Sequence, residues 1–260
     1  MRCEWIIEQT DVERLHDFLA KWNSSALVLE RENRNVKRNI PALSRDHVWQ
    51  VLVACLLTSV QRSGPDSAVS RFLSVSPFPL RLEECHHRSD LLEFAQGVLQ
   101  RFGGIRFTTK IPEQLEQNIS IVCDDGKWAT VESCLQGLTG QPSLGEEREV
   151  ADYLAESIHG FGPKQSRNFL QILGLSRFVV PLDSRVTKWL NDFGFPVELS
   201  GSMLSDRHYY EFVEDGLQEL CVPQTWFHVY SMPQCLLVLM RSSGLPRWRC
   251  GDLRVTARRY

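Results

Sequence analysis

Residues 149–190 decide the fold of this chain, and they read EVADYLAESIHGFGPKQSRNFLQILGLSRFVVPLDSRVTKWL. Apolar residues recur at helical spacing over about 149–158 and again over 163–173, and a four-residue turn at 159–162 separates the two segments. Pro163 stands at the first position of the second helix, where the backbone N–H that it lacks would have no partner within the helix. Two helices joined by so short a turn form a tight helical hairpin.

The turn consists of His159, Gly160, Phe161 and Gly162. Gly160 and Gly162 allow positive φ and leave the backbone without a covering side chain. The N–H groups of the turn and of the next helix's first turn then face outward as an anion site. A DNA phosphate suits such a site, so these four residues are candidate DNA contacts. The alternative is a plain corner between helices, in which glycine serves the geometry alone.

Lys164 lies in the first turn of the second helix, where the helix dipole disfavours a cation by ~0.3–1 kcal/mol. The same location lowers the pKa of its amine, and partial burial lowers that pKa further. A neutral amine is the form that attacks carbon and forms a Schiff base. The alternative is an exposed lysine whose ammonium reaches solvent or assists the phosphate.

Asp183 follows nineteen positions later, at the start of a helix expected over 184–193. An aspartate there caps the helix, which is worth ~1 kcal/mol. Capping uses one carboxylate oxygen and leaves the other to face a substrate, so the two roles are compatible.

The rest of the chain is also helical in pattern, which predicts an all-α protein. Further helices are expected at 12–22, 44–61, 65–73, 89–102, 115–122, 128–135, 147–158, 206–220 and about 226–240. Extended structure is expected only at 24–30, as an edge strand, and at 178–180, as a short link. Composition breaks at 137–146 and 194–205. We expect a core helical region at 44–193 that contains the hairpin (about 149–173), with 1–43 and 194–260 completing a second lobe.

Composition excludes several classes of protein. Hydrophobic residues make up 43%, and the longest apolar stretch, 48–57, is too short for a membrane span of about 20 residues. The N-terminus does not resemble a signal peptide, so we expect an intracellular protein, in the cytoplasm or nucleoid. No two of the eight cysteines are closer than 11 positions, which predicts no metal site. Net charge is −3, but residues 241–260 hold six arginines and one acid, a basic tail compatible with phosphate contact or with a solvated end.

The run GFGPKQSRNFLQILG…VVPLD resembles the signature of the helix-hairpin-helix DNA glycosylase superfamily. It is most similar to the small archaeal and bacterial 8-oxoguanine DNA glycosylase/lyase family. The segments VWQVLVACLLTSVQR and FGGIRFTTKIPEQLEQNI also resemble that family, so the likeness covers about 44–193. It implies two helical lobes with the active site between them. It also implies that Lys164 attacks the sugar of a flipped nucleotide and that Asp183 stabilises the positive charge that develops there.

The resemblance therefore implies a bifunctional enzyme, which removes a base and then nicks the strand by β-elimination. Its partner is double-stranded DNA with a damaged base, bound by a monomer. Gln61 is expected to fill the gap left by the flipped base, and Arg185 to approach the DNA backbone. The superfamily's iron–sulfur loop is absent, so no cofactor is expected.

8-Oxoguanine is the favoured base. The residues ARRY at 257–260 lack the terminal lysine that helps read 8-oxoguanine in that family, so an oxidised pyrimidine is the alternative substrate. A protein that binds DNA structure through the hairpin, without catalysis, is the alternative class.

Overall fold

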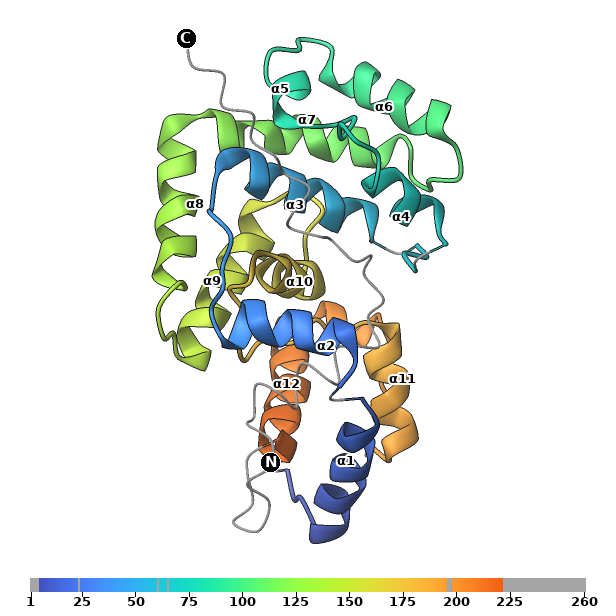
Figure 1. Ribbon diagram of the computed structural model, residues 1–260, viewed down its shortest axis with the longest axis vertical. Coiled ribbons are helices and arrows are strands. Elements are labelled where there is room, and N and C mark those ends of the chain that lie inside the picture. Colours follow the sequence, from blue (N-terminus) through green and yellow to red (C-terminus); the bar gives the residue numbers. More distant parts are fainter. Residues whose placement is uncertain (1–4, 23, 60, 65, 196–197, 222–260) are drawn as a thin grey trace.

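The computed structural model describes residues 5–22, 24–59, 61–64, 66–195 and 198–221. Regular structure in these ranges is entirely helical, which confirms the predicted all-α class (Figure 1). The elements in chain order are α1 (Gln9–Trp22), α2 (Ala26–Arg31), the π-helical turn η1 (Glu32–Val36), α3 (Arg45–Leu57), α4 (Ala68–Leu73), α5 (Leu82–Cys85), α6 (Leu91–Phe102), α7 (Lys110–Cys123), α8 (Asp125–Gly137), α9 (Leu144–Ser157), α10 (Pro163–Leu173), α11 (Ser184–Phe193), the 3-10 turn η2 (Met203–Ser205) and α12 (Arg207–Cys221). The helix expected at 226–240 and the arginines of 241–260 lie outside the described residues.

Helix boundaries agree with the sequence where a strong cap or stop is present. α10 and α11 have the predicted bounds, and each ends at a glycine in the left-handed conformation. α3 is shorter than predicted, because it ends at Leu57 rather than near Gln61. Its last turn closes at Thr58, whose hydroxyl donates to the carbonyl oxygen of Cys55 at 3.1 Å. This bond satisfies a backbone group that a longer helix would use.

The edge strand predicted at 24–30 is wrong, because the segment forms helix α2. Ser25 caps this helix, with its hydroxyl oxygen accepting from the N–H of Val28 at 3.4 Å. Val28 and Arg31, three residues apart, are both buried on one helical face. An edge strand needs a neighbouring strand to pair with, and the described ranges contain none.

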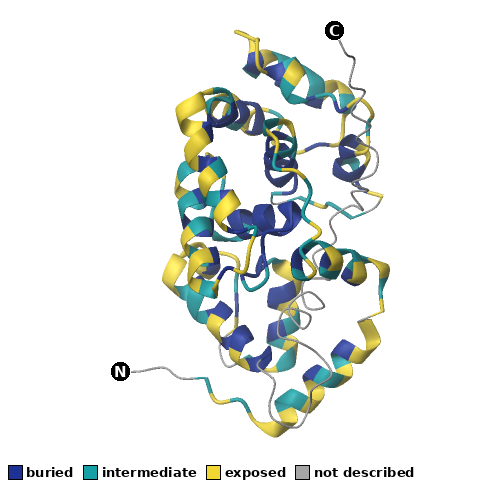
Figure 2. Ribbon diagram, turned by 60° about the vertical axis from the view of Figure 1, so that its left-hand side comes forward, coloured by how far each residue is buried: buried dark blue, intermediate teal, exposed yellow. Residues whose placement is uncertain are grey.

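The apolar side chains form two separate clusters. The larger includes α3 and the buried face of α10, and it runs from Val48 to Val179. The smaller is built from α1, α2, α11, α12 and the segment just before α11. Figure 2 shows buried residues on the inward faces of the helices and exposed ones on the outer faces. The helix that carries Lys164 therefore packs in the larger cluster, and the helix that Asp183 begins packs in the smaller one.

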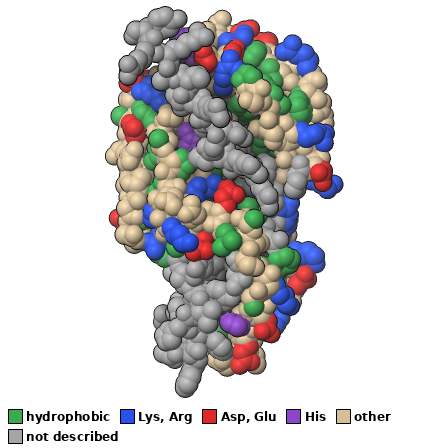
Figure 3. Space-filling view, viewed as in Figure 1, with side chains coloured by type: hydrophobic (Ala, Val, Ile, Leu, Met, Phe, Trp, Pro, Cys, Tyr) green, Lys and Arg blue, Asp and Glu red, His purple; other side chains and the backbone are tan. Residues whose placement is uncertain are grey.

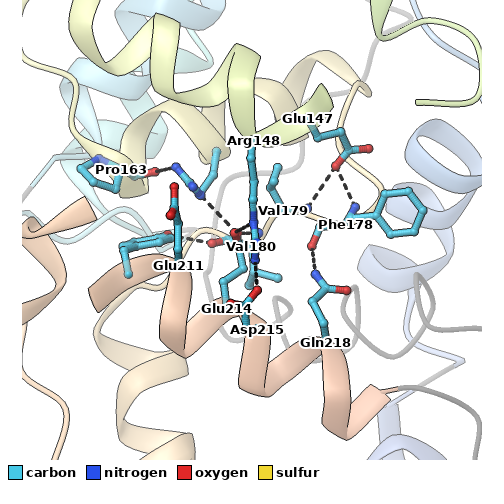
Figure 4. A network of polar contacts seen from close by, with 12 residues as sticks. Glu147, Arg148, Pro163, Phe178, Val179, Val180, Glu211, Glu214, Asp215 and Gln218 are labelled. Carbon is cyan, nitrogen blue, oxygen red and sulfur yellow. Dashed lines mark hydrogen bonds and ion pairs between the residues drawn. The ribbon is translucent and has the colours of Figure 1, made fainter. Parts of the chain in front are cut away.

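A layer of buried charges joins helices from the two clusters (Figure 4). Glu214 of α12 is 0% exposed, and its carboxylate accepts from Nε of Arg148 at 2.9 Å and from Nε of Arg167 at 3.1 Å. Arg167, also 0% exposed, lies on α10 and pairs with Asp152 of α9 at 3.4 Å. Buried charges are tolerated only when they are paired and hydrogen-bonded, so this layer fixes the mutual placement of α9, α10 and α12.

The linker between α10 and α11 is held by side chains. Glu147 of α9 accepts from the N–H groups of three successive linker residues, Arg177 at 2.7 Å, Phe178 at 2.8 Å and Val179 at 3.0 Å. At the start of the linker, the buried Asn35 accepts from the N–H of Ser176 at 3.3 Å.

Further along, Glu214 accepts from the N–H of Val180 at 2.8 Å. Gln218 donates to the carbonyl of Phe178 at 2.5 Å. A buried backbone segment must satisfy its polar groups, and here side chains replace a partner strand. Residues 178–180 form a link outside any helix, as predicted, and the link leads directly to Asp183.

We predict that Glu147 makes the stability of the protein fall as the pH rises from about 4.5 to 7. Burial raises the pKa of Glu147 to about 7, against the lowering effect of its three N–H donors. Between the two pKa values, the folded protein holds a proton on Glu147 that the unfolded chain has lost. The stabilisation from this proton is complete below the pKa of the unfolded chain and is lost above the pKa of the folded protein. As the pH rises between these values, the parent should lose on the order of 3 kcal/mol of its free energy of unfolding relative to Glu147→Gln. Urea denaturation across this pH range measures the shift, and equal pH slopes for the two proteins would contradict the prediction.

Candidate active site

The helical hairpin has the predicted form, with α9 and α10 joined by the turn at 159–162. Gly160 has φ +90°, and a Cβ built there would lie 2.4 Å from the side-chain amide of Gln114. The positive φ favours glycine at position 160, whereas the Gln114 side chain is flexible and could move aside. Gly162 has φ −147° and ψ −173°, an extended conformation that does not use the positive φ that glycine allows. It precedes Pro163, and the proline ring favours extended backbone in the residue before it.

Asn118 of α7 holds the turn and was missed by the sequence reasoning. Its Nδ2 donates to the carbonyl oxygen of His159, and its Oδ1 accepts from the N–H of His159, both at 2.9 Å. Asn118 is 0% exposed, so the amide is committed to this pair of bonds. The contact joins residues 41 positions apart, and nothing in the local sequence indicates it.

Three main-chain N–H groups at the hairpin remain available. Within the described residues, none accepts a hydrogen bond from the N–H of Gly160, Gly162 or Lys164. The side chain of His159 is exposed beside them, whereas the ring of Phe161 packs inward, 5.6 Å from the ring of Phe169. The hairpin therefore presents backbone donors at a helix N-terminus, the arrangement that binds phosphate.

Lys164 is the second residue of α10, and it lies near Cys55 of α3 and the start of α11. Burial is the largest influence on its amine and lowers the pKa of Lys164 below the ordinary value. The charge of Asp183 and the thiol of Cys55 act in the opposite direction, and the charge of Arg185 adds to the lowering. The pKa of Lys164 is therefore lowered, as predicted, and burial is the main cause.

Two polar side chains next to Lys164, those of Gln165 and Asn168, were not predicted from the sequence. Gln165 accepts from Nζ of Lys164 at 3.4 Å and donates to the carbonyl oxygen of Cys55 at 2.7 Å. Asn168 donates to the sulfur of Cys55 at 3.6 Å. Burial raises the pKa of Cys55 to about 12, so the thiol is neutral near pH 7. Asp183 is then the anion that acts on the Lys164 amine.

Asp183 caps α11 as predicted. Its Oδ1 accepts from the N–H of Arg185 at 2.9 Å and of Val186 at 3.0 Å. Among the described residues, none donates to its second oxygen, Oδ2. One oxygen therefore fixes the orientation of the carboxylate while the other is left for a substrate. The side chain of Arg185 is exposed at the same helix start.

Gln61 lies in the loop after α3, with both ends of its amide engaged. Nε2 donates to the carbonyl oxygen of Leu57, and Oε1 accepts from the N–H of Arg106 at 3.0 Å. In this structure the side chain joins two loops. Its expected place in the gap left by a flipped base stays a prediction.

Other surface features of the described residues do not point to a second site. Basic and acidic side chains are interspersed on the face of the molecule drawn in Figure 3. A shallow pocket of about 310 Å³ lies between α1 and α11, lined by residues that include Phe18, Trp189 and Phe193, and it contains none of the candidate residues. Within the described ranges, no three His, Cys, Asp or Glu residues gather as a metal site would require. In the same ranges, no helix has the length and apolar character needed to cross a membrane.

The all-helical architecture and the hairpin define the fold of the helix-hairpin-helix DNA glycosylases. Solved structures share it at a TM-score of 0.58. The 8-oxoguanine DNA glycosylase of Methanocaldococcus jannaschii is 17% identical, over 82% of this chain and 86% of that one. A structure of the 8-oxoguanine glycosylase/lyase of that organism with a 15mer DNA containing 8-oxoguanine is 15% identical, over 89% and 94%. The 8-oxoguanine DNA glycosylase of Thermotoga maritima is 17% identical, over 88% and 93%.

No protein-family model matches the chain, and no curated protein matches its sequence. At this level of identity the likeness establishes the fold, and the site residues rest on the geometry described above.

We predict that the hairpin depends on the amide of Asn118. Asn118→Ala leaves the N–H and carbonyl of His159 without their partner, so the free energy of unfolding should fall by about 1–3 kcal/mol. Gln117→Ala is the matched control, because Gln117 is the preceding residue on α7 and is exposed. Its effect should stay within about 0.5 kcal/mol. Urea denaturation followed by circular dichroism compares the two, and equal small losses would show that the turn does not need Asn118.

Proposed function

We propose that the protein is a DNA repair glycosylase with lyase activity, acting on an oxidised base in double-stranded DNA. The observation that carries the proposal is the partly buried Lys164, whose pKa is lowered, beside the oriented carboxylate of Asp183 and next to a hairpin whose N–H groups have no acceptor among the described residues. The shared fold supports it, because the solved structures of that fold are 8-oxoguanine glycosylases and one of them holds DNA containing 8-oxoguanine.

Binding begins at the hairpin. The main-chain N–H groups of Gly160, Gly162 and Lys164 hold a phosphate without regard to sequence. The side chains of His159 and Arg185 are both exposed, and we assign them contacts with the DNA backbone on either side of this phosphate. The damaged nucleotide leaves the duplex and enters the site, because the amine cannot reach a stacked base's sugar.

The chemistry uses one amine and one carboxylate. The neutral Lys164 amine attacks the anomeric carbon, the carbon–nitrogen bond to the base breaks, and the base leaves with the bonding electrons and takes up a proton. Asp183 stabilises the positive charge that the sugar carries as this bond breaks. Loss of a proton from the attached amine and opening of the sugar ring give an imine. Removal of the neighbouring proton then expels the 3′ phosphate by β-elimination, and the strand is nicked.

These steps require only side chains of this chain, so the proposed reaction needs no metal ion or iron–sulfur cluster. We propose that a monomer carries it out inside the cell, with Gln61 filling the space left by the flipped base.

8-Oxoguanine is the proposed base, because the sequence around Lys164 and the solved structures point to the same substrate. An incision assay over duplexes that carry single defined lesions tests the choice. Equal or faster release of an oxidised pyrimidine would replace 8-oxoguanine as the substrate and leave the chemistry unchanged.

Lys164→Gln should abolish strand nicking and covalent trapping while the protein still binds duplex DNA. Only an imine between a protein amine and the sugar can be reduced by borohydride to a stable cross-link. Because burial lowers the pKa of Lys164, trapping by the parent at an abasic site should rise with pH to a midpoint below the ordinary lysine value of 10.5.

Lys127→Gln on α8 is the control for this variant, since Lys127 contacts Ser120, away from the hairpin, and trapping should be unchanged. Cross-linking by Lys164→Gln would assign the nucleophile to another amine. A parent that never cross-links to lesion or abasic duplexes would favour a non-catalytic DNA-binding protein.

Asp183→Asn should keep the fold and lose most base excision. Asparagine caps a helix about as well as aspartate, but its neutral amide cannot balance the charge on the sugar. The control is Asp124→Asn, because Asp124 also caps a helix, accepting from the N–H of Lys127 at 2.9 Å, and lies outside the site. Single-turnover excision measures both, and near-normal excision by a folded Asp183→Asn protein would reduce Asp183 to a helix cap.

A further inference from the structure

The hydroxyl of Tyr210 bridges the backbone immediately before Asp183. It donates to the carbonyl oxygen of Val180 at 2.7 Å and accepts from the N–H of Leu182 at 2.6 Å. Pro181, between these two residues, has no N–H of its own. The N–H of Asp183 then donates to the carbonyl of Pro181 at 2.9 Å. One hydroxyl therefore closes the last turn of the linker before the candidate catalytic carboxylate.

The ring that carries this hydroxyl is itself held in place. Tyr210 is 0% exposed, and the guanidinium of Arg167 lies 4.6 Å from the centre of its ring. Arg167 is in turn bound by Glu214, which also accepts from the N–H of Val180. Burial raises the pKa of Tyr210 above its ordinary value, so the hydroxyl stays protonated and donates.

The two ends of the site are supported differently. Lys164 lies at the start of α10, where Gln165 contacts α3 and the hairpin turn is held by Asn118. Asp183 lies beyond the far end of α10, at the end of the linker. The hydroxyl of Tyr210 contacts only this second end, through Val180 and Leu182.

We infer that Tyr210 is a positioning residue for Asp183, which acts by fixing the backbone at 180–182 so that the free carboxylate oxygen faces the reacting sugar. The inference rests on the proposed glycosylase function and adds a specific residue to it. A displacement of about 1 Å in a reacting group can cost a factor of 100 in rate. A hydroxyl remote from the substrate can therefore affect the chemical step strongly.

Tyr210→Phe removes the hydroxyl and keeps the buried ring. Single-turnover excision of the lesion base should fall by about 10- to 100-fold. Trapping at a preformed abasic site should stay within about twofold of the parent, since no base leaves there and the Lys164 amine is untouched. Affinity for duplex DNA should also be unchanged. The ratio of excision to trapping reports only on folded molecules, because both reactions need an intact site.

The adjacent residue provides a matched control. Tyr209 carries a buried hydroxyl to which no described residue is hydrogen-bonded. Tyr209→Phe therefore makes the same chemical change without removing a contact to the linker, and both reactions should keep the parent's rates.

Three results would overturn the inference. Normal excision by Tyr210→Phe would show that the hydroxyl does not position Asp183. A parallel loss of excision, trapping and binding, or a variant that does not fold, would assign the hydroxyl to stability alone. A parent that never traps on any duplex would overturn the proposed function and this inference with it. If the parent traps normally, a negative result for Tyr210→Phe overturns only this inference.

Discussion

The arrangement of the whole site depends on one buried carboxylate, that of Glu214. It accepts from Arg148 of α9, Arg167 of α10 and the N–H of Val180, so a single side chain of α12 joins both helices of the hairpin to the linker. Removing one partner of a buried ion pair costs about 3–5 kcal/mol, because the remaining charge is left without compensation. The charged layer adds paired, hydrogen-bonded contacts of fixed direction between helices of the two apolar clusters, and these contacts favour the observed alignment.

That alignment brings opposite electrostatic requirements together. In the proposed reaction, the amine of Lys164 must lose its charge to react, and the carboxylate of Asp183 must keep its own. Burial of Lys164 favours the neutral amine more than the nearby carboxylate favours the ammonium. The carboxylate of Asp183 accepts from two N–H groups at the start of α11, where the helix dipole is positive. The two helix N-termini therefore have different neighbours, the proposed phosphate site at α10 and a carboxylate at α11.

Local sequence patterns predicted the parts of the structure that local chemistry determines. Pro163, Gly174 and Asp183 mark the ends of α10 and α11, and these helices have the predicted bounds. The residues that hold the site were not predicted, because Asn118 and Tyr210 act across 41 and about 30 positions and resemble ordinary core residues in sequence. The strand expected at 24–30 failed for a related reason. A short segment such as 24–30 can be compatible with a strand, but only a partner elsewhere in the chain can make one.

The linker between α10 and α11 has a consequence for how the chain can vary. Its backbone is bound by side chains that belong to other segments, Asn35, Glu147, Glu214 and Tyr210, and its own side chains contribute little to those bonds. The length of 177–180 is therefore constrained independently of its composition. One inserted residue adds up to about 3.5 Å of extended chain and shifts every N–H from its acceptor. Val179 and Val180 are both 0% exposed and belong to different apolar clusters, so an insertion here would also move one of them out of its cluster.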